Sequence, residues 1–354
     1  MMDLTRRTIM MGGLAVTLAP IAGRAAAASP VAGEPLWFVH PELRPAAAMM
    51  QRMTASFPSI SDKTLTAMRE MNTKYARPPL STIAVEKRVI PGRGDPHDVV
   101  LYAVNAKPGT RRPGILHTHG GGYILGSATD GLVALQELAS TLDCAIVTVD
   151  YRLAPETRYS GSIEDNYSGL RWLHDNADKL GVDPARIAVM GESAGGGHAA
   201  LLAITARDRR EVPVAFQCLI YPMLDDRTGS SRPVQGHVGT LLWTAEANRY
   251  GWRSFLGQEP GTKTVPPAAV PAREMDLSGL PPAWIGVGSI DLFAAEDMAY
   301  AQRLIAADVM TELVVVPGAF HGFDLIGASG TSIAQEFTAS KIRALKRALA
   351  PTPA

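Results

Sequence analysis

Short apolar runs alternate with longer amphipathic stretches over most of the chain. Runs that are apolar almost throughout are typical of strands buried on both faces of a parallel sheet. They cover 113–119, 144–151, 186–191, 214–222, 282–288 and 312–318, and two shorter strand patterns precede them at 83–92 and 98–106. Helical spacing lies between the runs, near 128–142, 162–179, 194–208, 293–307 and 332–349. The alternation predicts an α/β fold, with a mostly parallel sheet and helices on both faces.

Two segments depart from this alternation and predict a helical cap. Residues 29–80 come before it and carry apolar positions at helical spacing from residue 36 onward. Residues from about 225 to 275 interrupt it and contain several aromatic side chains, among them Trp243, Tyr250 and Trp252. We therefore expect a main domain over 81–354, with the 225–275 insertion and the N-terminal helices forming the cap above its sheet.

The first 28 residues have the pattern of an export signal. Arg6 and Arg7 stand directly before an apolar stretch over 9–22, and small residues follow up to Ala28. This order resembles a twin-arginine signal and predicts a periplasmic or secreted protein. An uncleaved amphipathic helix is the alternative. The apolar stretch is too short to span a bilayer, so no stable membrane insertion is expected.

Charge and cysteine content exclude some classes of protein. The 34 basic and 34 acidic residues balance, and no run of like charge indicates a nucleic-acid partner. Cys144 and Cys218 both lie inside apolar runs, so we expect buried free thiols rather than a disulfide framework. The sequence leaves their oxidation state open.

A serine flanked by small residues marks the candidate nucleophile. The pentapeptide Gly191–Gly195 reads G-E-S-A-G and lies between an apolar strand and a helical pattern. In that setting it fits the nucleophile elbow, a tight turn that exposes the hydroxyl of Ser193 at a helix N-terminus. An ordinary helix N-cap is the alternative for Ser193. Glu192 is expected to have a structural role.

A serine nucleophile needs a base, and the base needs an acid to orient it. Asp291 follows the strand pattern at 282–288, and His321 follows the one at 312–318. The order serine, acid, histidine is the order of the α/β-hydrolase elbow enzymes. Glu296 and Asp297 lie close enough in sequence to compete with Asp291 for the role of the acid.

A glycine-rich loop after another strand predicts the oxyanion hole. His119, Gly120, Gly121 and Gly122 directly follow the strand pattern at 113–119. Glycines allow backbone N–H groups to approach a developing oxyanion. We expect the N–H groups of Gly121, Gly122 and Ala194 to be the donors, with His119 and Gly120 supporting the loop.

Other polar residues near these motifs have structural interpretations. His117 and His119 share one face of a strand, but glycines rather than further ligands follow them, so no metal site is predicted. Asp150, Arg152 and Glu156 are expected to form an ion-pair network beneath the oxyanion loop. The aromatic residues of the cap, with Tyr123, either line an acyl or alcohol pocket or only pack the cap.

Together these motifs resemble the bacterial hormone-sensitive-lipase-like (type IV) esterases of the α/β-hydrolase superfamily. The resemblance rests on HGGGYILGS, DYRLAPE, GESAGG, LIYPMLDD, SIDLF and HGF and covers roughly residues 36–350. It implies an α/β-hydrolase fold with a helical cap and a triad of Ser193, Asp291 and His321. It also implies no cofactor and hydrolysis of carboxylic esters of short to medium acyl chain. The export signal departs from the pattern, since many members of the family look cytoplasmic.

The leading hypothesis is an exported serine carboxylesterase whose partners are a small ester and water. An amidase, deacetylase or acyltransferase with the same triad is the alternative, because pocket shape chooses the acceptor. A non-catalytic ligand-binding relative is a further alternative, which the presence of His321 disfavours. The sequence does not determine the natural substrate or the oligomeric state.

Overall fold

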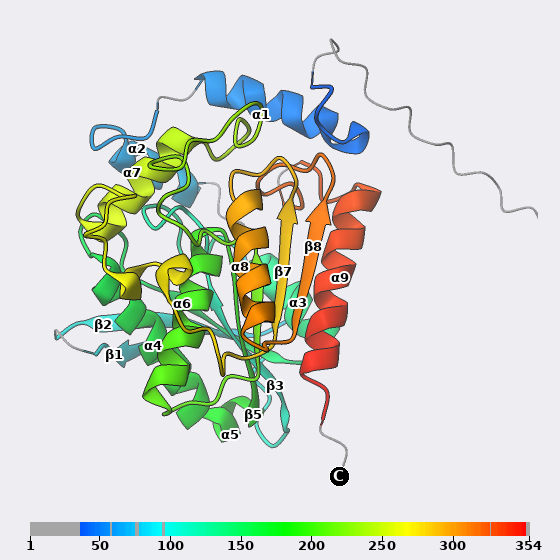
Figure 1. Ribbon diagram of the computed structural model, residues 1–354. Coiled ribbons are helices and arrows are strands. Elements are labelled where there is room, and N and C mark those ends of the chain that lie inside the picture. Colours follow the sequence, from blue (N-terminus) through cyan, green and yellow to red (C-terminus); the bar gives the residue numbers. More distant parts are fainter. Residues whose placement is uncertain (1–35, 57–58, 75–77, 94–95, 326, 352–354) are drawn as a thin grey trace, which may run out of the picture.

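The computed structural model describes residues 36–56, 59–74, 78–93, 96–325 and 327–351 (Figure 1). The predicted export signal at 1–28 lies outside the described residues. In the described part of the chain, no helix is both long and apolar enough to cross a membrane.

An eight-stranded sheet forms the centre of the molecule, in the order β1-β2-β4-β3-β5-β6-β7-β8. β1 pairs antiparallel with β2 and β2 with β4, whereas all later pairs are parallel, which confirms the predicted α/β fold. The strands are β1 Val85–Pro91, β2 Asp98–Val104, β3 Arg112–Thr118, β4 Ala145–Asp150, β5 Val182–Glu192, β6 Phe216–Ile220, β7 Ala283–Gly288 and β8 Thr311–Val316.

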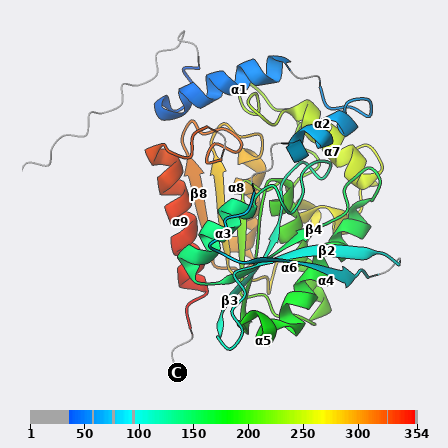
Figure 2. The ribbon, with the colours of Figure 1, turned by 180° about the vertical axis from the view of Figure 1, so that it is seen from behind.

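Helices cover both faces of this sheet. On one face the buried side chains of α4, α6 and α8 pack together, and on the other those of α3 and α9 do (Figures 1 and 2). The helices are α1 Arg44–Ser56, α2 Leu65–Lys74, α3 Leu132–Leu142, α4 Tyr159–Asp175, α5 Ala177–Leu180, α6 Ala194–Arg209, α7 Ala245–Leu256, α8 Ala294–Ala306 and α9 Ser332–Ala348, with short 3₁₀ helices η1 Pro41–Leu43, η2 Pro267–Ala269 and η3 Pro271–Arg273.

Two elements differ from the pattern that predicted them. The helical spacing over 162–179 divides into α4 and α5, because Asn176 ends the first helix and precedes the second. β5 begins at Val182, ahead of the apolar run 186–191. Val182 pairs with Arg112 of β3, and after a register shift the pairing resumes at Ile187 with Gly114.

Helices α1, α2 and α7 lie above the carboxyl ends of the parallel strands (Figures 1 and 2). The Oη of Tyr250 in α7 donates to Oδ1 of Asp62, just before α2, at 2.8 Å. Leu65 of α2 belongs to the same buried cluster as Tyr250 and Trp252. The N-terminal helices and the insertion thus meet on one side of the sheet, where loops after parallel strands carry functional residues.

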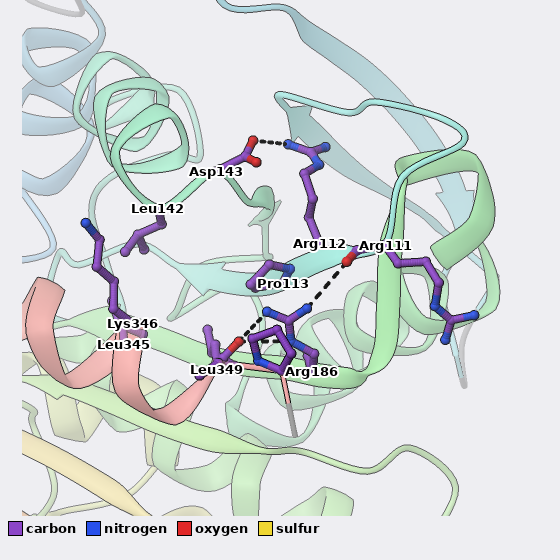
Figure 3. A pocket seen from close by; sticks show the side chains of 11 residues that line it. Arg111, Arg112, Pro113, Leu142, Asp143, Arg186, Leu345, Lys346 and Leu349 are labelled. Atoms are coloured by element: carbon purple, nitrogen blue, oxygen red, sulfur yellow. Dashed lines mark hydrogen bonds and ion pairs between the residues drawn. The ribbon is translucent and has the colours of Figure 1, made fainter. Parts of the chain in front are cut away.

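At the opposite end of the strands, where the parallel strands begin, the end of α9 packs against β3 and β5 (Figure 3). A cavity of about 400 Å³ lies there, between α9, the start of β3 and the loop that follows α3. The Nε of Arg186 in β5 donates to the carbonyl of Leu349 at 2.9 Å and so satisfies an otherwise open carbonyl at the helix end. Nη1 of Arg112 donates to Asp143 at 3.3 Å. These arginines serve the packing of the fold.

Both cysteines are buried and free. Burial is the main cause that raises the pKa of the Cys144 and Cys218 thiols to about 12. Neither thiol therefore has the thiolate character that reactive cysteines need.

Candidate active site

Ser193 occupies a strained turn between β5 and α6. Its φ of 57° and ψ of −122° place a non-glycine residue in a rarely adopted backbone conformation. The turn is held from both sides, because Ser193 N donates to Ile220 O and Met223 N donates to Ser193 O, each at 2.9 Å. The side chain of Ser193 makes no capping hydrogen bond to α6, so its hydroxyl is not used as a helix cap.

Glycines on either side of the serine leave no room for side chains. A Cβ on Gly191 would lie 2.3 Å from the carbonyl oxygen of Gly195, and one on Gly195 would lie 2.0 Å from the carbonyl oxygen of Thr118. The backbone of the serine turn is therefore in direct contact with itself and with the backbone at the end of β3. That close approach fixes the position of Ser193.

The structure brings the three residues of the predicted triad together. Nε2 of His321 lies 2.9 Å from Oγ of Ser193, and Nδ1 of His321 lies 2.8 Å from Oδ2 of Asp291. The other carboxylate oxygen of Asp291 accepts the backbone N–H of Phe293 at 2.9 Å. Asp291 is fully buried, and His321 and Ser193 are 5% and 7% exposed. The contacts are short and shielded from solvent, which strengthens their electrostatics.

Two aromatic rings set the orientation of the His321 imidazole. The rings of Tyr221 and Phe293 approach it edge to face, with centroids 4.9 and 5.2 Å away. Tyr221 is held in turn by its hydroxyl, which donates to Oδ1 of Asp324 at 2.9 Å. Burial raises the pKa of Asp324.

Three backbone N–H groups remain open beside Ser193. Gly121 and Gly122 have φ values of +123° and +60°, which L side chains rarely adopt. Their turn is closed by hydrogen bonds from Ile124 and Leu125 to the carbonyl of Gly121. Within the described chain, the N–H groups of Gly121, Gly122 and Ala194 donate to no protein acceptor. Backbone N–H groups without a protein acceptor are what an oxyanion hole requires.

Side chains at the end of β3 tie the oxyanion loop to the serine turn. The hydroxyl of Thr118 donates to the carbonyl of Gly195 at 2.7 Å. One residue earlier, Nε2 of His117 contacts Oε2 of Glu192 at 2.8 Å. The strand that leads into the oxyanion loop is therefore joined to the turn on both sides of Ser193, at Glu192 and Gly195. Glu192 has a structural contact, as expected.

His119 lies flat on a neighbouring ring rather than toward a ligand. Its imidazole stacks on Tyr151 with centroids 4.1 Å apart, and Tyr151 Oη donates to the carbonyl of His119 at 2.8 Å. Nδ1 of His119 contacts the carbonyl of Gly120. In the described ranges, no three His, Cys, Asp or Glu side chains are grouped so that they would hold a metal ion.

The two carboxyl groups that compete with Asp291 in the sequence point elsewhere. Oε1 of Glu296 accepts the N–H groups of Leu224 and Asp225 at 2.7 and 3.0 Å. Asp297 is fully buried, and its carboxyl oxygens have no partner within the described chain. Burial first, and then the neighbouring carboxylates, raises the pKa of Asp297 well above its usual value. Of these three carboxyl groups, Asp291 is the one that contacts His321.

The expected network of Asp150, Arg152 and Glu156 is wrong in its connections. Among described residues, no ion pair joins these three. Nε of Arg152 instead pairs with the buried Asp165 at 2.9 Å, and Asp150 accepts the N–H of Ala128 at 3.0 Å. The apolar pattern gave no sign of these partners because they come from other elements.

Glu156 acts on the oxyanion loop through Arg69 of α2. Nη1 of Arg69 donates to Glu156 at 2.8 Å, and its Nε donates to the carbonyl of Ile124, also at 2.8 Å. Nη2 of Arg69 reaches the carbonyl of Ala154 at 2.7 Å. Sequence reasoning missed Arg69, because its partners lie 55 to 87 positions away and no local motif surrounds it.

Several of the known proteins that this chain resembles are esterases. Carboxylesterase NlhH of Mycobacterium tuberculosis is 36% identical over 237 residues, which cover 67% of this chain and 74% of NlhH. Esterase LipI of the same organism is 35% identical over 219 residues, 62% of this chain and 67% of LipI. A solved bacterial heroin esterase shares 33% identity with a TM-score of 0.79, over 89% of this chain and 99% of that one. Esterase LipW of Mycobacterium marinum shares 34% identity with a TM-score of 0.72, over 90% and 98%.

A family model described as the alpha/beta hydrolase fold matches residues 115–325, more than half of the chain. This range contains the serine turn, the glycine loop, the acid and the histidine. The chain therefore belongs to the α/β-hydrolase fold family, in its hormone-sensitive-lipase-like branch, and is a carboxylic ester hydrolase.

Proposed function

We propose that this ester hydrolase is an exported serine carboxylesterase that acts on esters of short to medium acyl chain. The contact chain from Ser193 through His321 to Asp291 carries the proposal. His321 Nε2 takes the hydroxyl proton as Ser193 Oγ attacks the ester carbonyl carbon. The carbonyl oxygen becomes an oxyanion, which the open N–H groups of the glycine loop and Ala194 stabilise.

The rest of the cycle returns the enzyme to its starting state. The tetrahedral intermediate collapses, the bond to the alkoxy oxygen breaks, and His321 gives its proton to the leaving alcohol. A water molecule then attacks the acyl-enzyme while His321 takes a proton from it. Breakdown of the second intermediate releases the carboxylic acid and returns the proton to Ser193. Asp291 stabilises the imidazolium in both halves of the reaction.

Two observations support a small acyl group. Ser193 is only 7% exposed, so its side chain is largely covered by its neighbours. Trp243 and Leu242 of the insertion lie against the glycine loop and the histidine loop, beside Gly122 and Gly322. A large acyl group would have to displace the indole of Trp243, and displacement of a packed side chain is costly.

Hydrolysis of p-nitrophenyl esters from acetate to palmitate tests the proposal, with the protein lacking residues 1–28 beside Ser193→Ala. We expect hydrolysis of the short and medium esters, with a fall in kcat of at least about 10³-fold in the variant. Activity confined to the longest esters would contradict the proposed chain length. Equal activity of the two proteins would contradict the role of Ser193.

Export is supported by the Arg6–Arg7 pair, the apolar stretch after it and the small residues up to Ala28. Expression of the full chain beside Arg6→Lys/Arg7→Lys in a bacterium with a twin-arginine pathway tests it. We expect the original chain outside the cytoplasm in a shortened form and the variant retained at full length. Retention of both would overturn the export proposal and leave the esterase proposal untouched.

A further inference from the structure

Residues 239–243, which we call the strap, run across the top of the catalytic loops ahead of α7. The strap is attached to the acid loop at one end. Gly239 N donates to the carbonyl of Ile290 at 3.0 Å. A Cβ on Gly239 would lie 2.6 Å from Cδ1 of Leu292, so the strap packs directly on the residue after Asp291.

Trp243 ends the strap and lies against the oxyanion loop. A Cβ on Gly122 would be 2.1 Å from Cη2 of Trp243, so the indole touches the backbone of that glycine. Nε1 of Trp243 donates to Oδ1 of Asn248 at 3.1 Å. Asn248 is fully buried and donates to the carbonyl of Thr228 at 2.8 Å. The ring therefore has a fixed orientation, set by a satisfied buried amide.

Leu242 points to the other side of the site. Its φ of +64° is unusual for leucine, and the turn around it is closed by a hydrogen bond from Trp243 N to Leu241 O at 2.9 Å. Cδ2 of Leu242 lies 3.1 Å from where a Cβ on Gly322 would be, next to His321. Its side chain is 37% exposed, whereas Trp243 is 7% exposed. Successive residues of the strap thus face two different catalytic loops.

The chemistry of ester hydrolysis distinguishes these two sides. In the tetrahedral intermediate the oxyanion faces the open N–H groups of the glycine loop, and the alkoxy oxygen must lie near Nε2 of His321 to receive its proton. The alcohol therefore leaves past the histidine loop, where Leu242 lies. The acyl chain takes a direction away from His321, and Trp243 lies against the glycine loop rather than the histidine loop.

We propose that Trp243 limits the length of the acyl chain and that Leu242 shapes the alcohol side, a division of roles that rests on the proposed esterase function. Both residues determine specificity through contact with the substrate's apolar groups. A bound acyl chain meets the fixed indole, whereas the alcohol meets a smaller and half-exposed leucine.

The test uses two ester series with the protein lacking residues 1–28. The first varies the acyl group from acetyl to dodecanoyl on p-nitrophenol. The second keeps the acetyl group and varies the alcohol from ethyl to naphthyl. For Trp243→Ala we expect the ratio of kcat/KM on p-nitrophenyl octanoate to that on the acetate to rise about tenfold or more, with the alcohol preference kept. For Leu242→Ala we expect the opposite result, a changed alcohol preference and an unchanged acyl ratio.

Controls separate this proposal from the esterase proposal and from misfolding. Tyr250→Phe removes one hydroxyl from α7 and is expected to keep both profiles. If Trp243→Ala does not fold, Trp243→Leu and Trp243→Phe give the graded comparison, and the acyl ratio should follow the size removed. An unchanged acyl ratio in folded Trp243 variants, or an acyl shift in Leu242→Ala, would overturn the division of roles. If the protein without these substitutions hydrolysed none of the esters, that result would instead overturn the esterase proposal.

Discussion

Nε2 of His117 lies 2.8 Å from Oε2 of Glu192, so the residue before Ser193 is joined to the strand that leads into the oxyanion loop. Nδ1 of His117 contacts Oγ1 of Thr148 at 2.9 Å, and both of those residues are buried. Burial alone would raise the pKa of Glu192, but the charge and hydrogen bond of His117 hold the pKa of that carboxyl below its usual value.

Replacement of Glu192 by Gln should therefore lower stability in a pH-dependent way. A carboxyl whose pKa is depressed in the folded state stabilises the fold above its usual pKa, and this contribution is lost as the pH falls through the lower value. We expect Glu192→Gln to lower the free energy of unfolding by about 1–3 kcal/mol at neutral pH. Thermal denaturation should show a difference from the original protein that is constant above about pH 5 and shrinks as the pH falls through the usual and then the lowered pKa of Glu192. A difference that stays constant with pH would show that charge is not involved.

Asp291→Asn should reduce turnover strongly with little change in fold. An asparagine at this position can donate to Nδ1 of His321 and favour the wrong tautomer, so we expect kcat to fall by about 10⁴-fold. Asp297→Asn is the matched control, because Asp297 is a buried carboxyl near Asp291 in the sequence that makes no contact with His321. Turnover of p-nitrophenyl acetate measures both, and an equal fall in the two variants would contradict the assignment of the acid.

Gly122→Ala should damage the oxyanion loop in a way that a second substitution partly repairs. The new Cβ would meet Trp243 at 2.1 Å, and we expect a fall in kcat of about 10²-fold from the displaced N–H. Gly122→Ala/Trp243→Ala removes the clash but keeps the strained φ, so kcat should recover in part.

Gly121→Ala gives the comparison for that experiment. Its Cβ would lie 2.1 Å from the backbone carbonyl oxygen of Leu125, which no side-chain truncation removes. Truncation of Trp243 should therefore leave the Gly121→Ala defect unchanged. Rescue of both glycine variants to the same extent would mean that the Trp243 contact is not the cause.

Arg69→Ala should loosen the attachment of α2 to the oxyanion loop. The lost hydrogen bonds to the carbonyls of Ile124 and Ala154 predict a fall of about 1–3 kcal/mol in the free energy of unfolding, measured in urea, and a lower kcat/KM. Glu156→Gln removes only the exposed ion pair and should cost at most about 1 kcal/mol. If the two variants lost equal stability, the carbonyl contacts would not be the important ones.

The sequence predicted the sheet well because most of the parallel strands carry an apolar run, which in β7 is buried at every position. β7 and β8, for example, begin within a residue of their runs at 282–288 and 312–318. The start of β5 was missed because Asp183 and Pro184 interrupt the apolar pattern. That stretch lies within the register shift against β3, between the Val182–Arg112 and Ile187–Gly114 pairs, where hydrophobicity carries no signal.

The site was predictable where glycines and chain order constrain it, and unpredictable where distant side chains meet. Ser193, Asp291 and His321 follow strands whose carboxyl ends share one edge, so topology alone brings them near each other. Contacts such as Arg69 with Ile124, or Trp243 with Asn248, depend on the path of the cap. No spacing rule gives that path.

The glycines of the serine turn also show which positions near the site can be redesigned and which cannot. Gly191 and Gly195 face backbone atoms at distances that no side chain tolerates, so a mutational library should leave them untouched. Trp243 and Leu242 instead contact the glycine loop and the histidine loop through their side chains. Randomisation of those two positions would sample new substrate preferences on an unaltered catalytic frame, and most of its members should remain folded.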